Sequence, residues 1–79
     1  MAEIKKIDEV LDTKGLLCPL PVVKAKLAIE EMDTGKVLQV LATDPASPTD
    51  FAAWCRETGN TLVDSSKDGK VFVFAIRKG

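Results

Sequence analysis

The sequence predicts an α/β protein, arranged as an α+β two-layer sandwich in which two helices cover one face of a four-stranded mixed sheet. Two observations lead to this prediction. Strand-like segments alternate with helical ones, and a helix between the first two strands makes them parallel through a right-handed crossover. An Asp68-Gly69 turn signal joins the last two strands as an antiparallel hairpin. The predicted order is β-α-β-α-β-β, over residues 8–13, 19–33, 36–43, 47–58, 61–66 and 70–77.

The first three elements are delimited by glycine, proline and apolar runs. The segment DEVLDT, residues 8–13, has the length and composition of a short strand, and Gly15 follows it. Pro19 suits the first turn of a helix, where its missing N–H would have no partner, and Gly35 suits the end of that helix. The segment KVLQVLAT, residues 36–43, is almost continuously apolar, which indicates a buried central strand.

The second helix and the hairpin follow from similar signals. Ser47 suits the N-cap of a helix, and Pro48 and Asp50 suit its first turn, where a carboxylate complements the helix dipole. Gly59 is expected to end this helix. The two strands that follow are joined by the turn sequence KDG at residues 67–69, so they should pair with each other.

Length and composition exclude several classes of protein. The chain has 79 residues, which predicts a single domain over residues 1–79. Such a chain buries only about 60% of its unfolded surface, so its core is thin. The formal net charge is −1, whereas a protein that binds nucleic acid directly usually has a basic excess. Two cysteines and no histidine are too few for a typical zinc site, so no metal or other cofactor is expected.

No segment has the features of a targeting or membrane-spanning sequence. Residues 1–6 are polar, with no apolar stretch behind them of the kind found in signal peptides. No run approaches the roughly 20 apolar residues of a membrane span. We therefore expect a cytoplasmic monomer with no membrane contact, in a reducing compartment where a disulfide framework would not persist.

The first predicted helix has two apolar stripes when its residues are placed about 100° apart. One stripe is expected to meet the sheet. The other could pack against the second helix, which we favour because core roles are commoner than interface roles, or it could form a docking patch with Lys24 and Lys26 at its rim. The first stripe consists of Val22, Ala25, Ala28, Ile29 and Met32, and the second of Leu20, Val23 and Leu27.

The segment GLLCPLP, residues 15–21, places Cys18 at the predicted N-cap, where the helix dipole favours a thiolate. Pro21 stands where a C-x-x-C motif has its resolving thiol, and no histidine is present to form a Cys–His pair. Such a thiol suits a group received from one protein and given to another, for example sulfane sulfur held as a persulfide. On composition alone, an inert capping cysteine is an equally good interpretation.

The second cysteine, Cys55, is expected to lie in the core. It forms an i, i+3, i+4 apolar set with Phe51 and Trp54 on the second helix. A lesser alternative makes it a second sulfur site or a resolving thiol for Cys18. An oxidoreductase of that kind needs the two Cα atoms within about 7 Å, and we expect a larger separation.

The last strand leaves open a different function, that of a non-catalytic interaction or regulatory module. Both of its sides are apolar, which is unusual for a sheet with one face in water. A self-association or partner surface is one explanation, although small apolar residues are common on half-wet sheets. One side carries Phe72, Phe74 and Ile76, and the other Val71, Val73 and Ala75.

Three segments resemble the TusA/SirA/YedF family of small sulfur carriers over nearly the whole chain. They are LDTKGLLCPLPVVKAK, with its Cys-Pro-x-Pro motif, LATDPASPTDFAAWC and FAIRKG. The resemblance implies the two-layer fold already predicted and a role for Cys18 as persulfide carrier. It also implies supporting roles for Gly15, Pro19 and Pro21. Leu20 is apolar where some relatives have an acidic residue.

The resemblance also implies partner proteins. The sulfur donor would be a cysteine desulfurase or a rhodanese. The acceptor would be a relay protein serving tRNA thiolation, molybdenum cofactor assembly or sulfur oxidation. Docking would then involve Leu20, Val23, Lys24, Lys26 and Leu27 beside the thiol.

Overall fold

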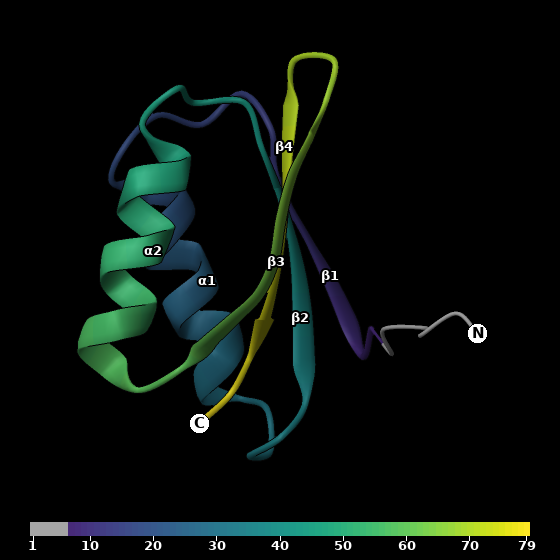
Figure 1. Ribbon diagram of the computed structural model, residues 1–79, viewed down its shortest axis with the longest axis vertical. Coiled ribbons are helices and arrows are strands. Elements are labelled where there is room, and N and C mark those ends of the chain that lie inside the picture. The colour runs from purple at the N-terminus through teal and green to yellow at the C-terminus, as the bar shows by residue number, and fades with distance from the viewer. Residues whose placement is uncertain (1–6) are drawn as a thin grey trace.

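The computed structural model describes residues 7–79 and contains two helices and one four-stranded sheet (Figure 1). Residues 1–6, for which the sequence predicts no targeting role, lie outside the described residues. The elements follow the predicted order β-α-β-α-β-β. They are β1 (Glu9–Thr13), α1 (Leu20–Glu30), β2 (Val37–Ala42), α2 (Ser47–Thr58), β3 (Thr61–Asp68) and β4 (Val71–Arg77).

The sheet is mixed, with the spatial order β1-β2-β4-β3. Strands β1 and β2 are parallel, as their helical connection predicts, and β3 and β4 form the predicted antiparallel hairpin. Strand β4 inserts between β2 and β3, so the almost continuously apolar β2 lies inside the sheet. Strand β3 is longer than predicted and has an irregularity between Leu62 and Asp64, where the alternation of its side chains changes register.

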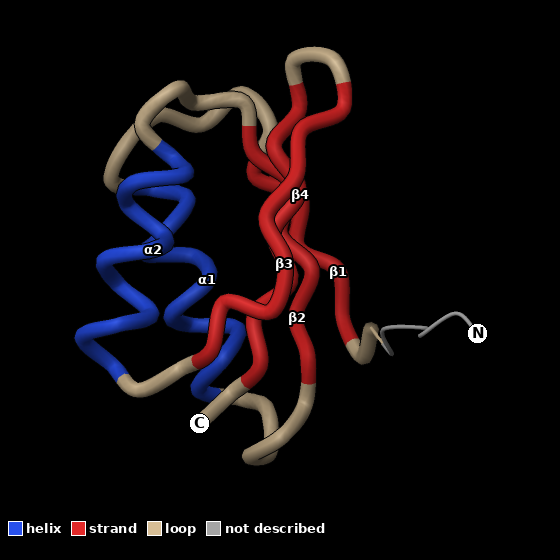
Figure 2. The backbone as a smooth tube through the Cα atoms, in the orientation of Figure 1, coloured by secondary structure: helices blue, strands red, loops and turns tan. Residues whose placement is uncertain are grey.

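Both helices lie on the same face of the sheet, which confirms the two-layer prediction (Figure 2). The core fills the space between the layers. Its two largest fully buried side chains are Phe51 of α2 and Phe74 of β4, whose ring centroids are 4.8 Å apart. The first predicted stripe of α1 faces this core, with Ala25, Ile29 and Met32 buried and Val22 and Ala28 packed at its margin.

The predicted helix boundaries need three corrections. Helix α1 spans Leu20–Glu30 rather than 19–33, because the N–H of Met32 bonds to the Ile29 carbonyl in a tight turn that ends the helix. Helix α2 has Ala46 at its N-cap, and Ser47 is already helical. The Ser47 hydroxyl is buried without a hydrogen-bond partner, so it does not cap the helix. Gly59 ends α2 at a positive φ of 82°, as predicted.

The two helices begin at the same end of the molecule, above the ends of β1 and β2 (Figure 1). This follows from the topology, because each helix comes after one of two parallel strands. The β1–α1 and β2–α2 loops therefore lie together at that end, and they build the candidate site. Within residues 7–79, neither helix is long and apolar enough to cross a membrane.

Candidate functional site

The exposed thiol of Cys18 lies in the loop between β1 and α1. Cys18 is not the N-cap that the sequence predicts. Pro19 holds that position, and the Pro19 carbonyl accepts the N–H of Val23 while the N–H of Leu20 bonds to Leu17. The tight turn over Leu17 to Leu20 therefore delays the helix by one residue. Pro21 is buried in the first turn of α1, directly after the loop that carries Cys18.

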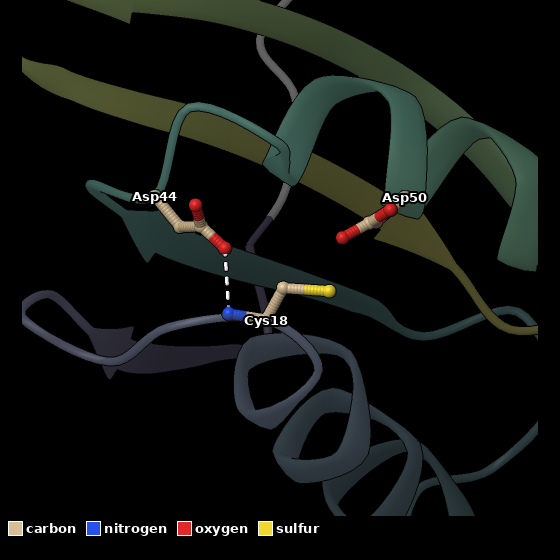
Figure 3. Close-up of side chains that lie close together, drawn as sticks. All are labelled: Cys18, Asp44 and Asp50. Atoms are coloured by element: carbon tan, nitrogen blue, oxygen red, sulfur yellow. Dashed lines mark hydrogen bonds between the residues drawn. The ribbon is translucent and has the colours of Figure 1, made fainter.

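A buried carboxylate in the β2–α2 loop holds the Cys18 loop in place (Figure 3). Asp44 is only 8% exposed. Its Oδ2 accepts the backbone N–H of Cys18 at 2.6 Å, and its Oδ1 accepts that of Ala46 at 3.2 Å. One residue earlier in the same loop, Thr43 Oγ1 accepts the N–H of Gly15 at 2.9 Å. The β2–α2 loop thus fixes two points of the loop that presents the thiol.

Gly15 makes the sharp turn that leads from β1 towards the thiol. Its φ is +86°, in the left-handed region that residues with a Cβ rarely adopt. A side chain would have space at this position, since nothing lies within 4 Å of an added Cβ. The glycine is therefore needed for its backbone conformation and not for close packing.

The carboxylate of Asp50, in the first turn of α2, is directed at the Cys18 sulfur (Figure 3). Cys18 Sγ and one carboxylate oxygen each from Asp50 and Asp44 all lie within 4.8 Å of one another. The thiol proton therefore has an acceptor beside it, supplied by the other helix. From the sequence we expected Asp50 only to complement the dipole of the second helix, because a local helix signal does not show which side chain of the neighbouring loop lies beside it.

This acidic environment reverses the expected effect on Cys18. The N-terminus of α1 was expected to favour the thiolate. Instead, hydrogen bonding to Asp50 raises the pKa of the Cys18 thiol above its ordinary value, and desolvation and the negative charges of Asp50 and Asp44 add to this. The prolines contribute to the outcome, since neither Pro19 nor Pro21 has an N–H to offer the sulfur. The surroundings of Cys18 therefore favour the protonated thiol over the thiolate.

The same three groups are the ones within residues 7–79 that could together hold a metal ion. A thiolate and two carboxylates would give three ligands of mixed type, whereas structural zinc sites usually have four nitrogen or sulfur ligands. Both oxygens of Asp44 already accept backbone N–H groups. We therefore interpret the two carboxylates as groups that position Cys18 and favour its protonated thiol, and we assign no metal to them.

A pocket of about 260 Å³ opens beside the thiol, between the two helices. One wall comes from α2 and the other from the start of α1. The pocket is apolar except for the thiol and two carboxylates. Its lining residues are Cys18, Pro19, Val22, Asp50, Ala53, Trp54 and Glu57.

The second apolar stripe of α1 is exposed, so the favoured expectation that it packs against α2 is wrong. Leu20, Val23 and Leu27 are 46%, 43% and 56% exposed. Helix α1 meets the sheet through its first stripe, and Val22 faces α2 across the pocket. Lys24 and Lys26 are also exposed, close to the stripe in the helix. An exposed apolar surface thus lies on the helix that follows the thiol, with Lys24 beside it and Lys26 paired with Glu30 at 3.2 Å.

Cys55 lies in the core, as predicted. It is 3% exposed, and burial raises its pKa to about 11. Both cysteines are free thiols. A buried protonated thiol is a poor nucleophile, which leaves Cys18 as the reactive one.

The face of the sheet opposite the helices mixes apolar and polar side chains. Its apolar residues extend beyond β4 to Val10, which is 60% exposed, and to Leu41, which pairs with Val73. On β4, Ala75 is buried, and Val71 and Val73 are half-buried. Polar neighbours lie beside them, since Gln39 and Asp64 both pair with Ala75. The expectation of a monomer stays a prediction.

Fold and site together define a class: small two-layer α/β proteins that present a single exposed thiol at the start of a helix. Comparison with known proteins makes this class specific. The family model described as "Sulfurtransferase TusA" matches residues 9–78. The chain belongs to the TusA family of sulfur carriers.

Individual relatives support this assignment. The sulfur carrier protein TusA of Allochromatium vinosum is 48% identical over 71 residues, which cover 90% of this chain and 93% of the relative. A protein of Neisseria meningitidis serogroup A is 49% identical over 69 residues, 87% of this chain and 93% of that protein. The crystal structure of a SirA-like protein from Desulfitobacterium hafniense superposes with a TM-score of 0.79 at 29% identity. It covers 90% of this chain and 97% of that one.

Proposed function

We propose that Cys18 carries sulfane sulfur as a persulfide from a donor protein to an acceptor protein, and that residues 1–79 act as one carrier domain. The observation that supports this most directly is the presentation of Cys18. It is the exposed member of the two cysteines, and the buried carboxylate of Asp44 fixes its backbone. Membership of a sulfur-carrier family supports the same role for this thiol.

The transfer balances as an exchange between a thiol and a persulfide. The Cys18 thiolate attacks the outer sulfur of a donor persulfide, so that a new S–S bond forms at Cys18 Sγ and the donor's S–S bond breaks. The donor leaves as a thiolate with the electron pair and takes up the proton that Cys18 gave up. No external oxidant or reductant is consumed. An acceptor thiolate then attacks the outer sulfur held on Cys18, and Cys18 leaves as the thiolate.

The surroundings of Cys18 suit a sulfur that must survive between partners. A second thiol close by would release the outer sulfur by attacking the inner one. Pro21 stands at the position of the resolving thiol of a C-x-x-C motif, and Cys55 is sealed in the core. We therefore assign supporting roles to Gly15, Pro19 and Pro21, which shape and anchor the loop.

The donor that we propose is a cysteine desulfurase or a rhodanese, and the acceptor is a relay protein for tRNA thiolation, molybdenum cofactor assembly or sulfur oxidation. Both would meet the carrier in the cytoplasm. The exposed stripe of α1 supports docking of such a protein beside the thiol. It consists of Leu20, Val23 and Leu27, with Lys24 and Lys26 as basic groups for an acidic rim on the partner.

Intact-protein mass spectrometry tests the carrier role. The chain is incubated with a cysteine desulfurase and cysteine, or with a rhodanese and thiosulfate. We expect a gain of one sulfur atom that reductant removes. Cys18→Ser should abolish this gain, and Cys55→Ser should retain most of it. Sulfur loading that survives the loss of Cys18 would refute the proposal.

A further inference from the structure

The pocket beside Cys18 has one wall formed by a regular face of α2. Asp50, Ala53, Trp54 and Glu57 have the i, i+3, i+4, i+7 spacing that places side chains on one side of a helix. Cys18 is among the residues that line the pocket between this face and the start of α1. Any partner that exchanges sulfur with Cys18 must therefore cover or enter the pocket.

The charge of the pocket is entirely negative. Asp50 and Glu57 contribute carboxylates, and no lysine or arginine is among the lining residues. Within residues 7–79, neither carboxylate has an ion-pair partner, in contrast to Glu30, which pairs with Lys26 at 3.2 Å. The carboxylates are about two helical turns apart, with Ala53 and Trp54 between them. The pocket thus has a negative charge at each end of an apolar floor.

The volume and the lining of the pocket favour a side chain as the occupant. The volume of about 260 Å³ is below the range of roughly 300–1,000 Å³ that is typical of small-molecule sites. Lysine and arginine bury aliphatic stems along apolar surfaces while their charged ends stay in polar surroundings. Trp54 adds an aromatic ring, which attracts such cations.

We propose that this pocket receives an arginine or lysine side chain from the partner protein, with its charged end beside Asp50, its stem along Ala53 and Trp54, and the charge of Glu57 adding to the attraction from the other end. The inference rests on the proposed function, because the partner is the protein that exchanges sulfur with Cys18. It deepens that function by giving the partner a chemical signature, a basic residue next to its own reactive thiol. Recognition here is separate from the apolar stripe of α1, which lies outside the pocket.

The same contact would activate the thiol. In the free carrier, Asp50 favours the protonated form of Cys18. A cation beside Asp50 offsets that carboxylate, so the thiolate becomes easier to form when the partner is docked. The free carrier would then react slowly with unrelated electrophiles.

The test measures which disulfides Cys18 prefers. The chain is treated, with chelator present, with cationic cystamine and with neutral bis(2-hydroxyethyl) disulfide, and mixed-disulfide formation is followed by mass spectrometry. The rate ratio of the two reagents is divided by the same ratio for N-acetylcysteinamide. This division corrects for the different intrinsic reactivities of the two reagents. The thiolate fraction of Cys18 affects both rates equally, so it cancels in the ratio of the rates. We expect a cationic preference of about threefold to tenfold at low salt, decreasing as salt is added.

Matched variants identify the carboxylates that cause the preference for the cationic reagent. The double variant Asp50→Asn/Glu57→Gln should bring the normalised ratio close to one. Glu31→Gln, which removes an exposed carboxylate that does not line the pocket, should retain the preference. The proposal is overturned if the unmodified chain shows no preference, if the double variant keeps it, or if Glu31→Gln loses it to the same extent.

The experiments distinguish a failure of the pocket proposal from a failure of the proposal that Cys18 carries sulfur. Cation preference is measured on the unloaded protein and needs no persulfide, whereas sulfur loading is measured with a donor enzyme. A cationic preference without any loading would reject the carrier role and leave a cation-accepting pocket. Loading without a cationic preference would reject the pocket and leave the carrier role intact.

Discussion

At the scale of single residues, the reactivity of Cys18 depends on a residue of the other helix. Replacing Asp50 by Asn removes the negative charge and the best acceptor for the thiol proton. The cause of the raised pKa is then largely gone, so the pKa of Cys18 should fall and more thiolate should be present at neutral pH. We expect Asp50→Asn to be alkylated by iodoacetamide faster than the unmodified chain at neutral pH.

The pH profile of alkylation provides the measurement. Its midpoint should move to lower pH in Asp50→Asn, and it should stay in place in Asp33→Asn, which makes the same chemical change at an exposed position away from the pocket. A midpoint that is unchanged or higher in Asp50→Asn would show that Asp50 does not control the thiol.

The buried thiol of Cys55 gives a prediction about stability. Its pKa rises from an ordinary 9.0 to about 11 in the folded chain. The folded state therefore keeps the proton that the unfolded state loses, and the stabilisation is complete below pH 9.0 and is lost as pH rises through 11. A shift of this size corresponds to at most about 3 kcal/mol of unfolding free energy.

Urea unfolding at a series of pH values measures this loss. Cys55→Ala is the comparison, because it lacks the thiol while every lysine still titrates. The cavity that it creates lowers stability by a constant amount, so the slope against pH is the quantity to compare. Equal slopes in the two proteins between pH 9.0 and 11 would contradict the prediction.

At the scale of elements, helix α1 separates stability from recognition by its two stripes. Ile29 is buried against the sheet, whereas Leu27 is 56% exposed. We expect Ile29→Ala to cost about 2–5 kcal/mol of unfolding free energy, and Leu27→Ala less than about 0.5 kcal/mol. If the exposed stripe docks the sulfur donor, Leu27→Ala should slow loading from a cysteine desulfurase although the protein remains fully folded.

Loading from inorganic polysulfide is the matched control for this variant, because a small donor needs no docking surface. Leu27→Ala should load from polysulfide at the rate of the unmodified chain. A variant that is equally fast with both donors would remove the stripe from the interface. A variant that is equally slow with both would indicate a disturbed Cys18 loop.

The elements themselves were largely predictable because their signals are local. Pro19, Gly59 and the Asp68-Gly69 turn each act within a few residues, and the structure has a boundary or turn at or next to each of them. The errors also have local causes. A cysteine before proline looks like a helix cap, yet the turn ending at Leu20 uses Pro19 in that position. The spacing of apolar residues predicts two apolar stripes on α1, but it does not indicate which of them stays exposed when only one other helix lies on the same face of the sheet.

At the scale of the whole molecule, the topology was predictable and the site only in part. The parallel crossover, the hairpin and the two layers were predicted and are confirmed, whereas the sequence led to no prediction of the spatial strand order, in which β4 lies between β2 and β3. The site depends on contacts between loops 26 residues apart in the chain, such as that of Asp44 with Cys18. The segment LATDPASPTDFAAWC, which carries part of the family resemblance, contains Asp44, but no local pattern shows that a buried carboxylate there accepts a hydrogen bond from the Cys18 loop.

That contact makes Asp44 a test of how the fold holds its reactive residue. Asparagine at this position can accept one of the two backbone N–H groups, but its NH₂ group cannot accept the other. Asp44→Asn should therefore leave a buried backbone donor unsatisfied and cost about 1–3 kcal/mol of unfolding free energy. Hydrogen exchange should quicken at the amide of Cys18 or of Ala46, whichever loses its acceptor, before the rest of the chain opens.

Two comparison variants, Thr43→Val and Ile29→Ala, distinguish the loss of the hydrogen bond between Asp44 and Cys18 from a general loss of stability. Thr43→Val removes the acceptor for the Gly15 N–H with almost no change in shape, and that bond is exposed, so its loss should cost less than that of Asp44. If the two loops form one unit, Asp44→Asn should slow donor-dependent sulfur loading more than Ile29→Ala does at equal unfolding free energy. Slowing that simply follows the free energy of unfolding would mean that Asp44 stabilises the fold without positioning the thiol.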